Sequence, residues 1–216
     1  MEFDRPVEIK VWGEFACFTR PEMKVERVTY PVMTPSAARG VLEAVFWKPE
    51  FTWNVREIEV LKPIRYFSIL RNEVNGRASE RSARGWAANG GGYVASDDRA
   101  QRNTLALADV AYIIRADAIP KSGEPGLEAK YRDQFRRRVA RGQCFAQPYL
   151  GTREFTACFS EPGADDRPEP LTMDLGRMLR DLAYAPGGSG AAVPMFFDAE
   201  LDQGVLRVPP FVVEGA

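Results

Sequence analysis

Apolar residues follow two different periods within the first fifty residues of the chain. From Val11 onward they alternate with other side chains, which is typical of a half-buried strand. After a loop the period changes to that of a helix, for which Thr34 is a suitable N-cap and Pro35 a suitable first residue. Pro49 ends this helix. Its apolar stripe consists of Ala38, Val41, Leu42, Val45 and Phe46.

The same two periods recur further along the chain. Alternation over residues 51–60 changes parity between Val55 and Ile58, which predicts a strand with a β-bulge. Three more elements are predicted: a strand at 64–70, a strand at 104–118 and a helix at 127–141 that Gly142 ends. Strand, helix, strand, strand is half of a ferredoxin-like unit.

Residues 71–102 have neither period and read as one long irregular segment. The segment contains five glycines, two of the chain's aromatic residues (Trp86 and Tyr93) and six arginines. Loops of this length are usually functional or disordered. Two interpretations stay open: a flexible arm that contacts an anionic partner, or a solvated insertion. The arginines are Arg71, Arg77, Arg81, Arg84, Arg99 and Arg102.

The last third of the chain differs in composition from the rest. A turn is predicted at 148–151, followed by an acidic, proline-rich connection at 161–170. We then predict a short helix at 175–182 and a hairpin over 195–208 that turns at 202–204. The predicted fold class is α+β, with one domain at 1–160 and a small β-rich domain at 161–216.

Charge is distributed unevenly between these two parts. Residues 161–216 hold 4 basic and 10 acidic residues, although the net charge of the whole chain is only −1. An anionic partner should therefore meet the N-terminal part. The chain has no run of apolar residues long enough to cross a membrane, and we expect a cytoplasmic protein without a membrane partner.

The absence of histidine restricts the chemistry most. Without histidine there is no Ser-His-Asp or Cys-His site and no histidine metal site, so proton transfer falls to Tyr, Lys, Asp, Glu or water. Cys17, Cys144 and Cys158 are far apart and form no CxxC pair, so we expect neither a zinc cluster nor a disulfide framework. Cys17 and Cys158 are predicted to be buried thiols. No metal or other cofactor is expected.

Several motifs, in order along the chain, resemble one protein family. They are TRPEMKVER, TPSAARGVLEA with the WKP that follows, LKPIRYFSILRNEV, QRNTLAL, RRRVARGQCF, QPYLG and LRDLAY. Together they are similar to the Cas5d family of type I-C CRISPR systems, which belongs to the RAMP superfamily of RNA-binding proteins. The resemblance implies a ferredoxin-like, RRM-like domain and a smaller C-terminal sheet.

The resemblance also implies an activity. Such proteins bind the repeat of CRISPR RNA, cut it without a metal ion and stay on the 5′ handle within the surveillance complex called Cascade. The implied catalytic tyrosine position is Phe46, and the implied histidine position is Asp117. Arg115 and Lys121 are the nearest cations to the implied lysine. An alternative catalytic set is drawn from Lys24, Lys48, Tyr112 and Lys121.

The binding residues follow from the cations of the same motifs. The implied RNA contacts are Arg20, Lys24, Arg27, Arg39, Arg71, Arg102, Arg136 and Arg137. The expected partners are CRISPR repeat RNA and other Cascade subunits, and double-stranded DNA is left open as a further partner. Because the catalytic positions are degenerate, two alternatives to an endoribonuclease remain: a non-catalytic RNA-binding scaffold subunit, and a generic ferredoxin-like nucleic-acid-binding module.

Overall fold

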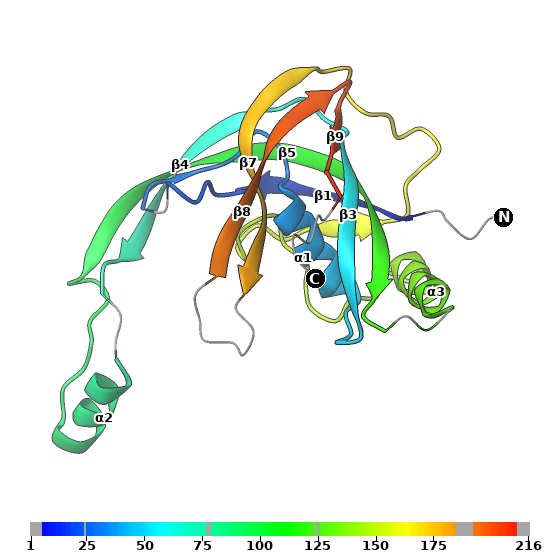
Figure 1. The fold of residues 1–216 in the computed structure, drawn as a ribbon. Coiled ribbons are helices and arrows are strands. Elements are labelled where there is room, and N and C mark those ends of the chain that lie inside the picture. The colour runs from blue at the N-terminus through cyan, green and yellow to red at the C-terminus, as the bar shows by residue number, and fades with distance from the viewer. Residues whose placement is uncertain are drawn as a thin grey trace.

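The computed structural model describes residues 6–23, 25–76, 79–122, 124, 126–184 and 192–210. Within these ranges the protein is an α+β fold of three helices and one curled sheet (Figure 1). The helices are α1 (Pro35–Val45), α2 (Glu80–Asn89) and α3 (Leu127–Ala140). The strands are β1 (Val7–Ala16), β2 (Arg27–Val28), β3 (Phe51–Val60), β4 (Tyr66–Val74), β5 (Arg99–Pro120), β6 (Cys158–Ser160), β7 (Met173–Tyr184), β8 (Ala192–Asp202) and β9 (Val205–Arg207).

Four strands in the order β6-β1-β5-β3 form one side of the sheet, with β6 at its edge, and all neighbours in this group are antiparallel. The helix α1 connects β1 to β3 by way of β2, and α3 connects β5 to β6. The expected bulge in β3 is confirmed, because its register with β5 shifts between Val55 and Glu57. This shift explains why the buried residues of β3 change parity along the strand.

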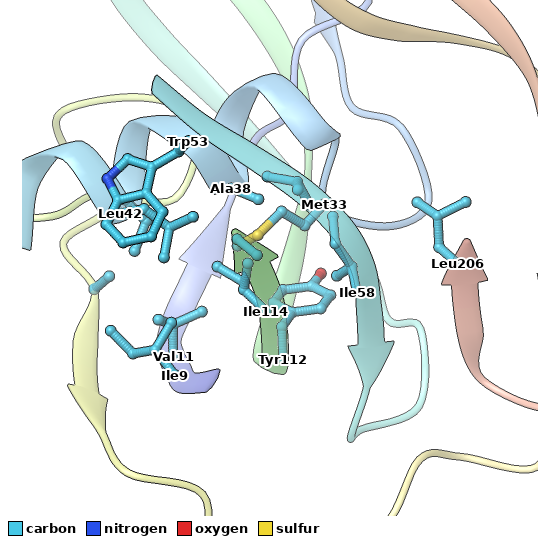
Figure 2. Close-up of a cluster of buried hydrophobic side chains, with 14 of the residues drawn as sticks. Ile9, Val11, Met33, Ala38, Leu42, Trp53, Ile58, Tyr112, Ile114 and Leu206 are labelled. Atoms are coloured by element: carbon cyan, nitrogen blue, oxygen red, sulfur yellow. The ribbon is translucent and has the colours of Figure 1, made fainter. Parts of the chain in front are cut away.

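The cap of α1 follows the sequence expectation. The Thr34 hydroxyl accepts a hydrogen bond from the Ala37 backbone N–H at 3.3 Å, and Pro35 occupies the first turn. The apolar stripe of α1 faces the sheet, and the helix contacts both β3 and β7, so that it lies inside the curl (Figure 1). Figure 2 shows Ala38 and Leu42 of α1 against strand residues such as Ile9 and Ile114. Burial of these side chains supplies the main stabilising free energy of the fold.

The segment 71–102 is more regular than the sequence indicates. Strand β4 extends to Val74, β5 begins at Arg99, and the two pair from Tyr66–Leu107 to Val74–Arg99. They form a ribbon that leaves the body of the molecule and carries α2 at its far end (Figure 1). The helix α2 contains no buried residue, so no apolar stripe marks it in the sequence. The prediction of an irregular loop was therefore wrong.

The predicted helix at 175–182 was also wrong, because these residues form part of strand β7. Leu175 and Met178 are both buried and are three residues apart, a spacing that indicates a helix. In the structure β7 contains two register shifts against β8, at 174–176 and at 179–181. Each bulge inserts an extra residue, so the period of two becomes locally three.

The predicted hairpin at 195–208 is confirmed. Strands β8 and β9 are antiparallel and are joined by Gln203 and Gly204, both with positive φ (48° and 78°). Two residues with positive φ are characteristic of a tight I′-type hairpin turn. Strand β9 also pairs with β3, so the C-terminal strands continue the central sheet. None of the helices in the described ranges is long and apolar enough to span a bilayer.

Candidate nucleic-acid interface

Phe46, the implied tyrosine position, ends α1 and lies in the core. Its ring stacks on Phe51 with a centroid distance of 5.5 Å and is tilted against Tyr131 at 6.4 Å. Its backbone carbonyl accepts a hydrogen bond from the Trp53 indole at 2.9 Å. Phe46 is 3% exposed and has no hydroxyl group, so it fixes the end of α1 and takes no part in proton transfer.

Arg138 of α3 reaches across to this end of α1. Its guanidinium lies over the Phe46 ring, 5.3 Å from the centroid, and donates a hydrogen bond to the Val45 carbonyl at 3.0 Å. The carbonyl end of a helix carries partial negative charge, which an arginine stabilises. No carboxylate of the described chain lies within ion-pair distance of Arg138. Its positive charge is therefore not neutralised by a described carboxylate, and it can attract an anionic ligand.

Two further candidate cations lie at the same end of the molecule. Lys48 follows α1 by three residues, and Lys121 directly follows β5, where its backbone N–H donates to the Glu50 carbonyl at 2.9 Å. Neither ammonium group makes an ion pair with the described residues. Phe46, Lys48 and Lys121 are therefore brought to one end of the sheet, together with Arg138.

The connection after α3 closes over the end of α1. Gly142 has a φ of 62°, and the N–H groups of Gly142 and Gln143 donate to the carbonyls of Val139 and Arg138. This is a Schellman motif, as the expected glycine stop requires. The chain then turns so that the N–H groups of residues 145 and 146 both donate to the Ala44 carbonyl, at 2.8 and 3.0 Å.

Arg115 and Asp117 lie on the other face of the sheet. Their neighbours Ala116 and Ala118 are buried in the core with Phe46, and side chains alternate along a strand, so residues 115 and 117 point away from that core. Asp117 is 5% exposed and its carboxylate is bound by Arg56. Phe46 and Asp117 therefore do not form one site.

On that outer face Asp117 lines a hollow of about 630 Å³ together with Arg56, Arg115 and Arg207. Its arginines are neutralised: Arg115 is bound by Glu8 at 2.7 Å and by Glu59, and Arg207 by Asp202 at 2.9 Å. These carboxylates, with that of Asp117, make the hollow a mixed-charge surface and not a cationic one. It is a poorer place for a phosphate than the unpaired cations at the end of α1.

Of the other residues in the alternative catalytic set, Tyr112 is excluded by burial. It is 2% exposed, and desolvation holds the pKa of its phenol well above the ordinary value. It packs edge-to-face against Phe18 in the core. Lys24 lies outside the described residues.

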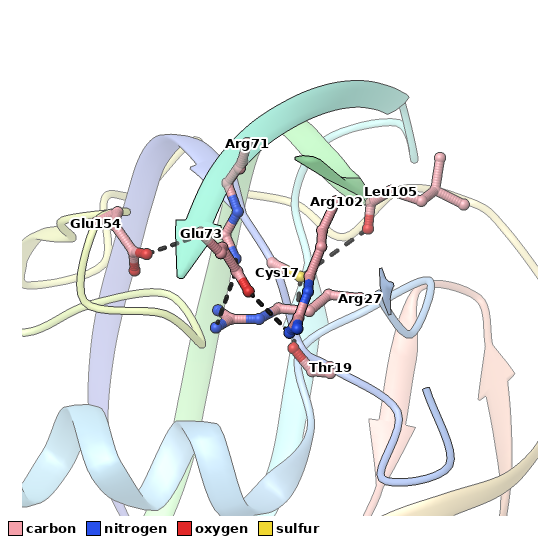
Figure 3. Close-up of polar contacts among 8 residues, drawn as sticks. All are labelled: Cys17, Thr19, Arg27, Arg71, Glu73, Arg102, Leu105 and Glu154. Carbon is pink, nitrogen blue, oxygen red and sulfur yellow. Dashed lines mark hydrogen bonds and ion pairs between the residues drawn. The ribbon is translucent and has the colours of Figure 1, made fainter. Parts of the chain in front are cut away.

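Three implied RNA contacts share one cluster at the base of the ribbon. Arg27, Arg71 and Arg102 converge on the Glu73 carboxylate, at 3.7, 2.8 and 3.2 Å (Figure 3). Arg71 also binds Glu154 at 2.8 Å, and the pKa of that carboxyl is held below its usual range, first by a backbone N–H and then by Arg71. The cluster joins β2, β4 and β5 and carries one positive charge in excess.

The remaining implied contacts are divided between structural and exposed positions. Arg39 is bound by Asp181 at 2.7 Å and by Glu43 at 2.7 Å, and so ties α1 to β7. Arg20 stacks on the Tyr30 ring, 4.4 Å from its centroid. Arg136 and Arg137 are exposed on α3 and form no ion pair within the described ranges.

Sequence reasoning missed two residues of this region and one thiol. Arg138 and Tyr131 are distant from Phe46 in sequence and meet it only because α3 packs beside α1, so a single sequence holds no signal for the contact. Cys17 is buried, as expected, but Cys158 is exposed in β6. Across the described ranges, no three histidine, cysteine, aspartate or glutamate side chains are grouped so that they could hold a metal ion.

Comparison with known proteins decides the family. The family model described as CRISPR-associated protein (Cas_Cas5) matches residues 7–211. The chain belongs to the Cas5d family. A relative from Thermus thermophilus, named CRISPR pre-crRNA endoribonuclease Cas5d, is 46% identical over 94% of this chain and 91% of its own length. A relative of the same name from Mannheimia succiniciproducens is 45% identical over 96% of both chains.

Solved structures with the Cas5d-like fold are more distant in sequence. A CRISPR-associated protein superposes with a TM-score of 0.65 at 22% identity, over 97% of this chain and 95% of its own. A functionally uncharacterized protein, SMU1763c from Streptococcus mutans, gives 0.65 at 21% identity, over 95% and 93%. A chain of a CRISPR RNA-guided surveillance complex gives 0.53 at 15% identity, over 95% and 89%. These likenesses concern the fold alone.

Proposed function

We propose that this chain is a pre-crRNA endoribonuclease, which binds CRISPR repeat RNA and remains on the 5′ handle as a subunit of a Cascade complex. The observation that carries the proposal is its 45–46% identity, over nearly the full length, to two proteins named as CRISPR pre-crRNA endoribonucleases.

The fold supports this function in its arrangement. The order β6-β1-β5-β3 with two crossover helices is that of a ferredoxin-like domain, the architecture of RRM-type RNA-binding proteins. We assign residues 1–160 to this RNA-binding domain and residues 161–216 to a small β-rich unit. The second unit is attached by β9, which pairs with β3, and by the bond of Arg39 to Asp181.

We place the reaction at the C-terminal end of α1. Cleavage through the 2′-hydroxyl needs a base for its proton, a cation for the phosphorane and an acid for the leaving 5′-oxygen. Lys48 and Lys121 are the titratable groups there that no carboxylate of the described chain neutralises, and Arg138 is the fixed cation. Arg138 stabilises charge and transfers no proton.

One observation favours the non-catalytic alternative. Phe46 has no hydroxyl, and the Asp117 carboxylate is bound by Arg56 on the other face of the sheet. A chain that keeps the binding surface and loses the proton-transfer groups would hold processed RNA without cutting it. The two functions differ in a single property, the ability of the purified chain to break the repeat RNA.

The test is incubation of labelled repeat RNA with the purified chain in EDTA. We expect one cut, with a 2′,3′-cyclic phosphate on the upstream product and a 5′-hydroxyl on the downstream product. Tight binding of the repeat without a cut would contradict the endoribonuclease function and favour the non-catalytic scaffold subunit. Equal affinity for the repeat and for an unrelated hairpin across salt concentrations would leave only the generic nucleic-acid-binding module.

A further inference from the structure

Two large aromatic side chains are exposed at the same end of α1 as the unpaired cations. Trp47 directly follows buried Phe46 and is 54% exposed. Phe145 is 82% exposed, more than any other large apolar side chain in the described ranges. Single exposed apolar residues are common and need no explanation. Two large exposed rings beside cations that no described carboxylate neutralises indicate a binding surface.

The backbone that presents Phe145 is held firmly in place. The Schellman motif at Gly142 fixes the end of α3, and the N–H groups of residues 145 and 146 both donate to the Ala44 carbonyl. Trp47 lies three residues after Ala44, so the backbone that carries each ring lies at the C-terminal end of α1. Neither ring is turned into the core, although the core lies directly below at Phe46.

The charge around the two rings is positive. Lys48 directly follows Trp47, Arg141 precedes Phe145 by four residues, and Arg138 lies over the Phe46 ring. None of these three cations makes an ion pair with a described carboxylate. Glu50 is the acidic residue closest to Trp47 along the chain, and Glu43 is bound by Arg39. Exposed aromatic rings beside unpaired cations match the two parts of a nucleotide, a base to stack on a ring and a phosphate to meet a cation.

We propose that Trp47 and Phe145 form a stacking site for unpaired bases of the RNA, next to the cations at the end of α1. This site rests on the proposed function, and it adds to it the residues that hold a single-stranded nucleotide beside the reaction. Stacking is tolerant of base identity because every base has a π-face, so the site positions the strand and does not read its sequence. The favoured occupant is RNA because the surrounding charge is positive; another protein subunit is the alternative that the test must separate.

The test is a double-mutant cycle on RNA affinity, in which a protein ring and an RNA base are removed separately and together. The variants are Trp47→Ala and Phe145→Ala, with Trp47→Phe and Phe145→Tyr as conservative partners. The control is Val193→Ala, which truncates a side chain that is 64% exposed on β8. Each protein is titrated with repeat RNA and with repeat RNAs that carry one abasic nucleotide at successive unpaired positions.

We expect each alanine variant to weaken binding by roughly 5- to 150-fold, the usual effect of losing one stacked base. The conservative variants and Val193→Ala should stay within about twofold of wild type. If a ring stacks on a base, an abasic nucleotide at that base's position should weaken binding to wild type by the same factor as the alanine substitution does. It should cause no further loss of affinity in the alanine variant, because the two changes remove the same contact. Because both rings are exposed, the thermal unfolding midpoints should be unchanged.

Three outcomes would overturn the site or its basis, and they are distinguishable. If wild type fails to prefer repeat RNA, the proposed function fails and the stacking site falls with it. If wild type binds and the alanine variants bind equally well, only the stacking site is wrong. If the alanine variants keep RNA affinity but no longer copurify with another subunit of the complex, the two rings form a protein-docking surface instead.

Discussion

At the scale of single residues, ion pairing separates structural cations from available ones. Arg39, Arg56 and Arg115 are each bound by carboxylates and fix the relative positions of strands and helices. Lys48, Lys121 and Arg138 have no such partner among the described residues. The sequence shows which residues are cationic but not which are neutralised, because the partners are brought together only by the sheet.

A substitution at Asp117 should affect stability and not cleavage. Asp117→Asn keeps the size of the side chain but removes the charge that Arg56 binds, so we expect a loss of about 1–3 kcal/mol in the free energy of unfolding. Cleavage of repeat RNA should stay within about twofold of wild type. Urea denaturation and single-turnover kinetics of the same preparation measure the two effects. A tenfold loss of rate at unchanged stability would place the reaction on the outer face of the sheet.

A pH-dependent contribution to stability should come from Asp166. Lys10 at 2.5 Å and the Gly163 N–H at 2.7 Å hold the pKa of this carboxyl below its usual range. A carboxyl with a depressed pKa stabilises the fold above its unfolded pKa of about 4, and that contribution is lost as the pH falls through the lower folded value.

The matched variants are Asp166→Asn and Asp165→Asn, which differ in whether the side chain removed binds Lys10. We expect Asp166→Asn to cost about 0.2–1 kcal/mol at pH 6, as for a surface ion pair, and progressively less below pH 4. Asp165→Asn should leave the free energy of unfolding unchanged at both pH values. Urea denaturation at pH 6 and pH 3 provides the comparison, and a cost for Asp166→Asn that is the same at both would rule out this linkage.

At the scale of elements, two glycines have opposite roles. Gly151 has a φ of 88°, and a Cβ there would lie 2.0 Å from the Cys17 carbonyl oxygen, so Gly151→Ala should cost about 2–5 kcal/mol. Gly40 lies inside α1 with no atom within 4 Å of an added Cβ, so Gly40→Ala should stabilise by roughly 0.5–1 kcal/mol. Thermal unfolding of the two variants shows whether each substitution raises or lowers stability. A Gly151→Ala variant as stable as wild type would show that the 148–151 turn can relax to accept the added Cβ.

The sequence predicts well those elements whose buried face is regular. Strand β1, helices α1 and α3, the bulge of β3 and the turn between β8 and β9 all follow from apolar period, caps and glycines. Strand β7 was misread because its two bulges imitate a helical spacing, and α2 was missed because no face of it is buried. The candidate interface was only partly predictable, since α3 supplies Arg138 to α1 through a tertiary contact.

At the scale of the whole molecule, the charge is sorted as the RNA-binding proposal requires. The described acidic residues of the part 161–216, from Glu161 to Asp202, lie in the strands and connections that complete the sheet, while Arg136 and Arg137 are exposed on α3. The outer face around Asp117 also holds arginines, but its carboxylates cancel them. The central claim is that RNA is cut at the end of α1 and not on that outer face.

The most direct test compares two variants that each remove two positive charges. Lys48→Ala/Lys121→Ala alters the end of α1. Lys62→Ala/Arg207→Ala removes two exposed cations that are paired with Asp109 and Asp202, and Arg207 lies on the outer face around Asp117. The measurement is the single-turnover rate of repeat RNA cleavage in EDTA, at saturating protein. We expect the first variant to lose roughly 10²-fold or more and the second to remain near the wild-type rate. Equal rates in the two variants, or a larger loss in the second, would contradict the placement of the reaction.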